Sequence, residues 1–174
     1  MSDEALEPIV ELNKWLWQRF KSALDEMTPE EANWRPLPQA NNISAIIRHL
    51  RIEAETHLAG LQGGEPLPVE TTPNLQRMID STPIDFDENL KELERLYVSF
   101  MVLLEKATFS ELRRRSASAY RNYPGERPQH LLSFHQSVHL TLHLGQIRMI
   151  RNLYRTTRGE PARFFPENPM FPKS

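Results

Sequence analysis

Three histidines recur at every fourth residue in the segment LLSFHQSVHLTLHLGQIRMIRNLY, which runs from Leu131 to Tyr154: His135, His139 and His143. Residues four apart lie on nearly the same face of an α-helix, with roughly 6 Å between their Cβ atoms. A metal ion held by imidazoles needs such convergence, because each nitrogen must come within about 2.0–2.1 Å of it. The spacing therefore predicts a helix here and favours a metal site on it.

A helical wheel places these histidines among apolar residues. With His135 at zero and about 100° per residue, His139 lies at roughly 40°, His143 at roughly 80° and Gln146 at roughly 20°. The apolar residues within about 60° of His135 on this wheel are Leu131, Leu132, Val138, Leu142, Met149, Ile150 and Leu153. The basic residues on the opposite side are Arg148, Arg151 and Arg155. We therefore expect the histidines to face the interior, where a titratable ring needs a partner.

A metal site has to be weighed against an ordinary core. A single buried histidine is more often a hydrogen-bonded core residue than a ligand, but two or three at this spacing reverse that preference. The chain has no cysteine, which excludes disulfides, thiolate ligands and a cysteine nucleophile. Any thiol chemistry would need an external thiol.

Composition narrows the remaining function classes. The chain has 174 residues and a formal net charge of −2, so we expect one domain over residues 1–174 and no general attraction to nucleic acid. The opening residues MSDEALEP are acidic and unlike a secretory signal. No apolar run reaches the roughly 18 residues of a membrane-spanning helix. We therefore expect a cytoplasmic protein without a membrane partner.

Apolar residues at three- and four-residue spacing predict four long amphipathic helices. Their approximate ranges are 5–27, 43–61, 84–107 and 128–156, and a capping box at Thr28–Glu31 predicts a short helix after the first. Residues 62–83 are too many for a tight hairpin and permit a crossover, with a helical turn at Leu75–Ile79. The predicted fold class is all-α, a four-helix bundle with a long crossover between helices 2 and 3.

The second predicted helix carries further polar candidates. His49 lies at the edge of its apolar face, Glu53 follows one turn later, and His57 lies closer to the middle of that face. From this helix alone, His49 is as readily a boundary residue hydrogen-bonded to Glu53 as a metal ligand.

Two motifs resemble a known family. The segment HLTLHLGQI, from His139 to Ile147, resembles the HxxxHxGQI motif on the last helix of the DinB-like superfamily. The segment NNISAIIRHL, which ends in His49 and Leu50, resembles the second-helix segment that carries this family's single ligand histidine. The order of the motifs matches as well, and the resemblance covers essentially the whole chain.

The resemblance implies a divalent metal, commonly nickel or zinc, held by His49, His139 and His143. It also implies the long crossover and, frequently, a homodimer. Characterised relatives include thiol-dependent S-transferases and a maleylpyruvate isomerase, which use low-molecular-weight thiols with a small-molecule substrate. By the same likeness, the expected function is thiol-dependent transfer to a small electrophile.

Three more residues are assigned catalytic roles beside the metal. Gln146 and Glu53 lie within about one turn of the ligands and can orient them or carry protons. His135 is expected beyond the metal as a proton-transfer group, because the outer two of three such histidines lie about 12 Å apart along a helix. If His135 is instead a fourth ligand, the site is closed and structural. The alternatives are therefore a non-catalytic, metal-stabilised binding module or a metal-dependent hydrolase.

Some apolar residues fall outside the expected core stripes. These are Leu140 and Leu144 on the last helix and the pair Trp15 and Trp17 on the first. Exposed apolar patches usually mark contact surfaces. We therefore expect these residues to contribute to the homodimer interface.

Overall fold

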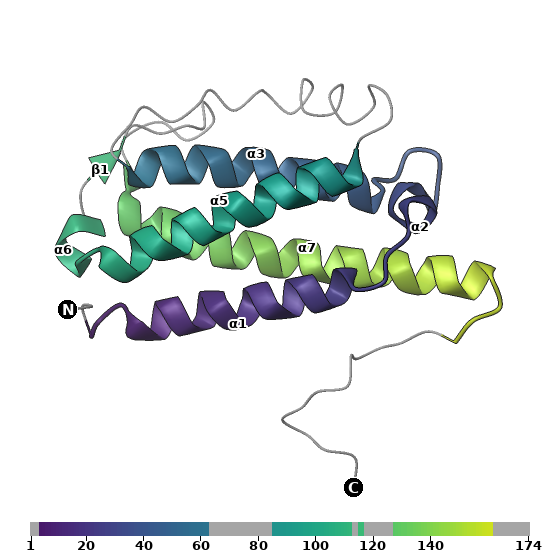
Figure 1. Ribbon diagram of the computed structural model, residues 1–174, viewed down its shortest axis with the longest axis horizontal. Coiled ribbons are helices and arrows are strands. Elements are labelled where there is room, and N and C mark those ends of the chain that lie inside the picture. The colour runs from purple at the N-terminus through teal and green to yellow at the C-terminus, as the bar shows by residue number, and fades with distance from the viewer. Residues whose placement is uncertain (1–3, 63–84, 113–114, 117–126, 162–174) are drawn as a thin grey trace, which may run out of the picture.

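Four long helices form the body of the protein in its computed structural model (Figure 1). The structure describes residues 4–62, 85–112, 115–116 and 127–161. The long helices are α1 (Glu7–Leu24), α3 (Ile43–Leu61), α5 (Phe86–Lys106) and α7 (Gln129–Thr157). The short elements are α2 (Pro29–Asn33), α6 (Phe109–Leu112) and an antiparallel pair of two-residue strands, β1 (Arg115–Ser116) and β2 (Arg127–Pro128). The predicted all-α bundle is confirmed.

The directions of the helices show how the bundle is connected. α1 and α5 are antiparallel, with Lys14 near the start of one helix 2.8 Å from Glu105 at the end of the other. α3 and α5 run in the same direction, and Arg51 donates to Asn89 across them at 3.1 Å (Figure 1). Because parallel neighbours cannot be joined by a tight hairpin, this arrangement of α3 and α5 agrees with the predicted long crossover. The expected turn at Leu75–Ile79 lies outside the described residues.

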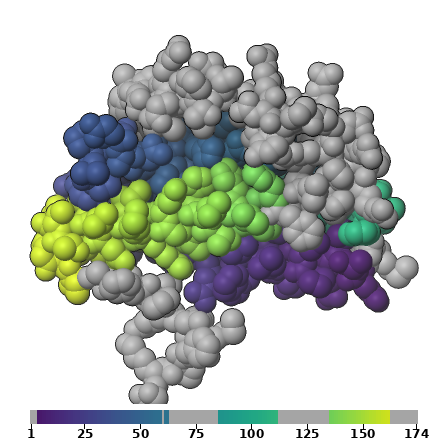
Figure 2. Space-filling model, turned by 180° about the vertical axis from the view of Figure 1, so that it is seen from behind, coloured from purple at the N-terminus to yellow at the C-terminus, as the bar shows by residue number. Residues whose placement is uncertain are grey.

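α7 lies between α1 and α3, and it can be followed in green and yellow between purple and blue in Figure 2. Ser137 of α7 donates to the side-chain oxygen of Asn13 on α1 at 3.0 Å. On the other side, His139 of α7 lies against His49 of α3. None of the described helices is long and apolar enough to cross a lipid bilayer.

Polar caps set the helix starts near the site. Thr28 accepts a hydrogen bond from the backbone N–H of Glu31 at 3.2 Å, and Pro29 is the first residue of α2, as the capping box predicts. The Asn42 side chain accepts from the N–H of Ala45 at 2.8 Å and so caps α3. The Asn42 cap fixes where α3 begins and hence where its histidines lie.

The core largely follows the predicted stripes. On α3, the predicted face is buried throughout: Ile43, Ile46, Ile47, Leu50, Ala54 and Leu61. Trp17 of α1 is buried and stacks on Tyr97 of α5, with ring centroids 4.2 Å apart. Leu12 is an exception, because it lies among apolar residues at three- and four-residue spacing in the first helix (Leu12, Leu16, Phe20) but is 44% exposed.

The buried face of α7 differs from the predicted one. Four residues expected inside are 42–62% exposed: Val138, Leu142, Met149 and Leu153. The buried face is centred instead on Leu140, Leu144, Ile147 and Arg151. On the wheel this centre lies roughly 130–150° from His135. The prediction of a histidine stripe in the middle of the buried face was therefore wrong, and His139 and His143 lie at its edge, half-buried.

Arg151 explains this difference. Its side chain is expected on the solvent side but is buried, and it pairs with Glu31 of α2 through contacts of 2.7 and 3.2 Å. The same guanidinium donates to the carbonyl oxygens of Ala23 and Asp25 at 2.7 and 3.1 Å. Because the hydrogen-bond donors of Arg151 are satisfied in this way, its charged side chain can lie in the interior. The buried face of α7 therefore includes Arg151 and differs in direction from the predicted face.

The predicted dimer contacts are also corrected on α7. Leu140 and Leu144 are 1% and 6% exposed, so they belong to the core of the chain and not to a contact surface. Trp17 is buried too, whereas Trp15 is 41% exposed with the Arg19 guanidinium over its ring. Apolar surface on α7 is provided instead by Val138, Leu142, Met149 and Leu153, which we call the α7 stripe.

Candidate metal centre

Three histidines from two helices converge on one point. The Nε2 atom of His139 lies 2.9 Å from Nε2 of His49 and 2.9 Å from Nε2 of His143. His49 comes from α3, and the other two come from successive turns of α7. These three residues, which we call the three-histidine set, form a group able to hold a metal ion.

Burial keeps these rings in the form that binds metal. Desolvation, together with the neighbouring His143 and His135, lowers the pKa of His49 to about 4. Desolvation likewise lowers the pKa of His139 to about 2, with contributions from the adjacent histidines. The pKa of His143 is lowered by burial, and its hydrogen bond to Gln146 opposes that shift. At neutral pH all three imidazoles are therefore uncharged and carry a lone pair.

Gln146 fixes the tautomer of His143. Its side-chain oxygen lies 2.7 Å from Nδ1 of His143. Because an amide oxygen only accepts, Nδ1 carries the proton and Nε2 presents its lone pair to the other two rings. Such outer partners orient metal-bound histidines and raise their basicity.

The arrangement fits a divalent ion. Around a tetrahedral ion with bonds of about 2.0–2.1 Å, ligand nitrogens lie roughly 3.3 Å apart. The observed separations of 2.9 Å are slightly shorter, so small movements of the rings make room for an ion. The Nδ1 atoms of His49 and His139 are buried and lack a hydrogen-bond partner among the described residues, which is consistent with rings held by their Nε2 atoms. Three neutral nitrogens leave at least one coordination position open.

A buried carboxylate lies one turn away. Glu53 is 4% exposed, and its oxygen lies 3.6 Å from Nε2 of His57, which is 1% exposed. Nδ1 of His57 in turn lies 2.5 Å from the side-chain oxygen of buried Gln136. Glu53, His135 and His139 also form a group whose ligand atoms lie within 4.8 Å of one another. The carboxylate is therefore held directly beside the histidines.

The structure brings together every residue that the sequence singled out. His49, His139 and His143 converge, Gln146 contacts His143, and Glu53 and His135 lie together against His139. His57 and Gln136, which hold Glu53, were not assigned to the site. Their contact spans 79 residues of sequence, although the position of His57, eight residues after His49 on the same helix, was a usable signal.

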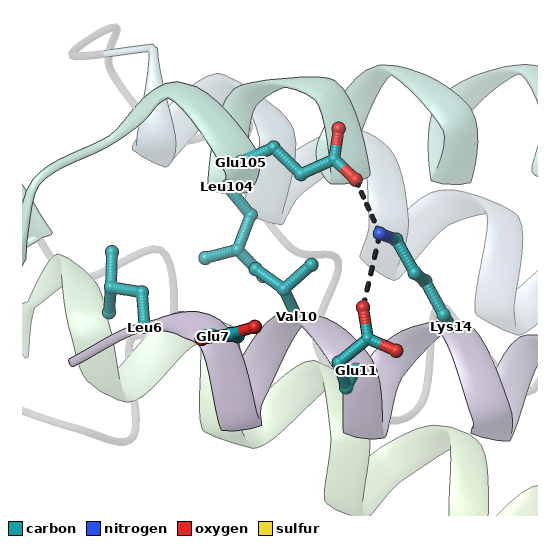
Figure 3. Close-up of a pocket in the computed structure, with 7 residues that line it drawn as sticks. All are labelled: Leu6, Glu7, Val10, Glu11, Lys14, Leu104 and Glu105. Atoms are coloured by element: carbon teal, nitrogen blue, oxygen red, sulfur yellow. Dashed lines mark hydrogen bonds and ion pairs between the residues drawn. The ribbon is translucent and has the colours of Figure 1, made fainter. Parts of the chain in front are cut away.

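A hollow elsewhere in the bundle is not part of this centre. It measures about 360 Å³ and is lined by residues at the start of α1 and the end of α5, without any histidine (Figure 3). Lys14 bridges Glu105 at 2.8 Å and Glu11 at 3.3 Å along its wall. The lining holds three carboxylates, of Glu7, Glu11 and Glu105, and the single ammonium group of Lys14, and none of these residues belongs to the candidate metal centre.

Comparisons with known proteins agree with this architecture. A crystal structure of a conserved protein from Enterococcus faecalis has the same fold, with a TM-score of 0.66 and 18% sequence identity. The match covers 88% of this chain and 98% of that one. No curated protein matches the sequence. The model of the DinB superfamily matches residues 13–147, which is more than half of the chain and includes all three converging histidines. The chain therefore belongs to the DinB superfamily.

Proposed function

We propose that the protein is a metal-dependent enzyme that joins a low-molecular-weight thiol to a small electrophile. The observation that supports this best is the meeting of three neutral Nε2 atoms, because an open set of neutral ligands suits a reactive ion better than a structural one. Structural zinc sites are usually closed by four ligands. Nickel and zinc are the proposed ions, since imidazole nitrogen suits both.

A bound divalent ion would supply Lewis acidity that favours the deprotonated form of a thiol or water. Proton transfer and positioning are the roles of residues of the chain. Glu53 or His135 takes the proton of the thiol, and the sulfur then forms its bond to an electrophilic carbon as the leaving group departs. Glu53 suits this role because His57 holds its carboxylate in place at 3.6 Å. Gln146 is the positioning residue, since it orients His143.

Replacing His135 tests its catalytic role. The metal should remain in His135→Ala, because the three-histidine set is intact, while the rate of thiol conjugation should fall by roughly 10²–10⁴-fold, as for loss of a general acid–base group. The measurement pairs metal analysis with a conjugation assay over several small thiols and a chromogenic electrophile. Thr141→Ala, an exposed position between His139 and His143, is the control and should match the wild type. A wild-type rate no higher than that of free thiol and metal would refute the proposed activity.

We also propose that the protein forms a symmetric homodimer through the α7 stripe. Gly145 lies within this stripe and is exposed, and a Cβ atom there would meet nothing within 4 Å. Glycine in a helix costs about 1 kcal/mol relative to alanine, and no contact with the described part of the chain requires it here. Leu142 precedes Gly145 by three residues and Met149 follows it by four, so an antiparallel copy of α7 crossing at Gly145 would set leucine against methionine.

Light scattering tests the dimer. At micromolar concentration the wild type should show twice the mass of the 20.3 kDa chain, whereas Leu142→Glu should show the single mass. Val98→Glu on α5 is the matched control, since Val98 is 54% exposed but lies outside the α7 stripe. A wild-type monomer, or a dimer unaffected by Leu142→Glu, would contradict this interface.

A further inference from the structure

Side chains of types that bind metal ions, histidine and glutamate, recur at every fourth residue along two antiparallel helices. α3 carries His49, Glu53 and His57, and α7 carries His143, His139 and His135, both at every fourth residue. His49 lies against the later pair on α7, while the rings of His57 and His135 lie 5.1 Å apart further along. A shift of four residues on both helices, about 6 Å along the bundle, therefore converts one group of donors into the next.

We propose that this shifted group is a second position for the bound cation. It consists of Glu53, His135 and His139, which we call the carboxylate set, and its ligand atoms lie within 4.8 Å of one another. It shares His139 with the three-histidine set. One cation therefore occupies either set, and His139 serves both.

The carboxylate in this set belongs to a buried side chain of the bundle. Glu53 is 4% exposed, and a charge so deeply buried is costly unless it is paired. His57 lies 3.6 Å from it, and the amide oxygen of Gln136 accepts the proton on Nδ1 of His57 at 2.5 Å. His57 and Gln136 thus fix the position of the Glu53 carboxylate beside His135 and His139, so a cation bound there would meet a carboxylate oxygen that is already in place.

The two sets differ in the ions that they suit. The three-histidine set offers only nitrogen, which favours Ni²⁺, whereas the carboxylate set adds an oxygen and a negative charge, which favour Mn²⁺. The choice of ion has a functional consequence that rests on the proposed thiol transfer. With the cation in the three-histidine set, Glu53 and His135 remain available to take a proton. With the cation in the carboxylate set, both are ligands and are not available.

Titration of the metal-free protein with Mn²⁺ and Ni²⁺ tests the second position. Glu53→Gln keeps the size of the side chain and removes its charge. It should lower Mn²⁺ affinity by at least about tenfold, which corresponds to about 1.4 kcal/mol, and leave Ni²⁺ affinity within about twofold. Glu55→Gln is the control, because Glu55 is half-exposed and pairs with Arg51 at 3.5 Å; it should change neither affinity. Unchanged Mn²⁺ affinity in Glu53→Gln, or an equal loss for both ions, would overturn the proposal.

The reciprocal variant removes a ligand from the other set. His49→Ala should lower Ni²⁺ affinity by at least about tenfold while Mn²⁺ affinity stays within about twofold. An equal loss of both ions in His49→Ala would show one position only and overturn the proposal. The two proposals fail separately, because a wild type that binds Ni²⁺ but does not conjugate thiols would refute only the proposed activity.

Discussion

Replacing His139 with alanine is expected to remove more bound metal than any other single change in the protein. Its Nε2 atom lies 2.9 Å from both other nitrogens of the three-histidine set, and it also belongs to the carboxylate set. Loss of an outer partner typically lowers metal affinity by about 10–100-fold, so loss of this shared ligand should exceed that range. The measurement is the metal content per chain after dialysis against nickel or zinc at a buffered free concentration.

Thr141→Ala is the control for this prediction as well, because Thr141 lies on the same helix but on a different face from His139 and His143. Its side chain donates to the Ser137 carbonyl at 2.8 Å, so its loss alters α7 only locally. His139→Ala protein that retains its metal fully would show that the converging histidines are a packed core cluster and not a metal centre.

Arg151→Met is expected to destabilise the fold strongly. Breaking a buried pair from one side costs roughly 3–5 kcal/mol, because the remaining charge is left without compensation. Here that charge is Glu31, which is 5% exposed and receives two hydrogen bonds from Arg151. Adding Glu31→Leu should recover part of the loss, although the carbonyls of Ala23 and Asp25 still lack their donor. Urea unfolding of the metal-free protein measures both changes.

A second arginine provides the comparison. Arg158 lies 3.3 Å from Glu30, and the two side chains are 51% and 72% exposed. Exposed pairs contribute at most about 1 kcal/mol, so Arg158→Met should have little effect. Similar losses in Arg151→Met and Arg158→Met would mean that the buried pair does not hold α2 and α7 together.

Local sequence patterns predicted the helices well where apolar residues alone define the buried face. For α3, the observed bounds Ile43–Leu61 match the predicted ones, because most of the large apolar residues fall on one face and Asn42 supplies a cap. The same reasoning failed on α7. A wheel that weighs only hydrophobicity puts Arg151 outside, and its partner Glu31 lies 120 residues away in sequence, where no local pattern can reveal it.

The candidate centre was predicted in part for a similar reason. Spacing alone could pair His139 with His143, since both lie on one helix. The meeting of His49 with that pair depends on how α3 packs against α7, 90 residues away, and was expected only from the family resemblance. The support of Glu53 by His57 and Gln136 was missed, because it too depends on that packing. Contacts between helices decide which donors share an ion.

The most direct test is the position of the ion itself. In a crystal of the protein loaded with nickel, anomalous scattering at the nickel edge should give one strong peak per chain. That peak should lie about 2.0–2.1 Å from the Nε2 atoms of His49, His139 and His143, as imidazole ligation requires. A peak elsewhere, or none at these three nitrogens, would contradict the metal centre on which the proposed function depends.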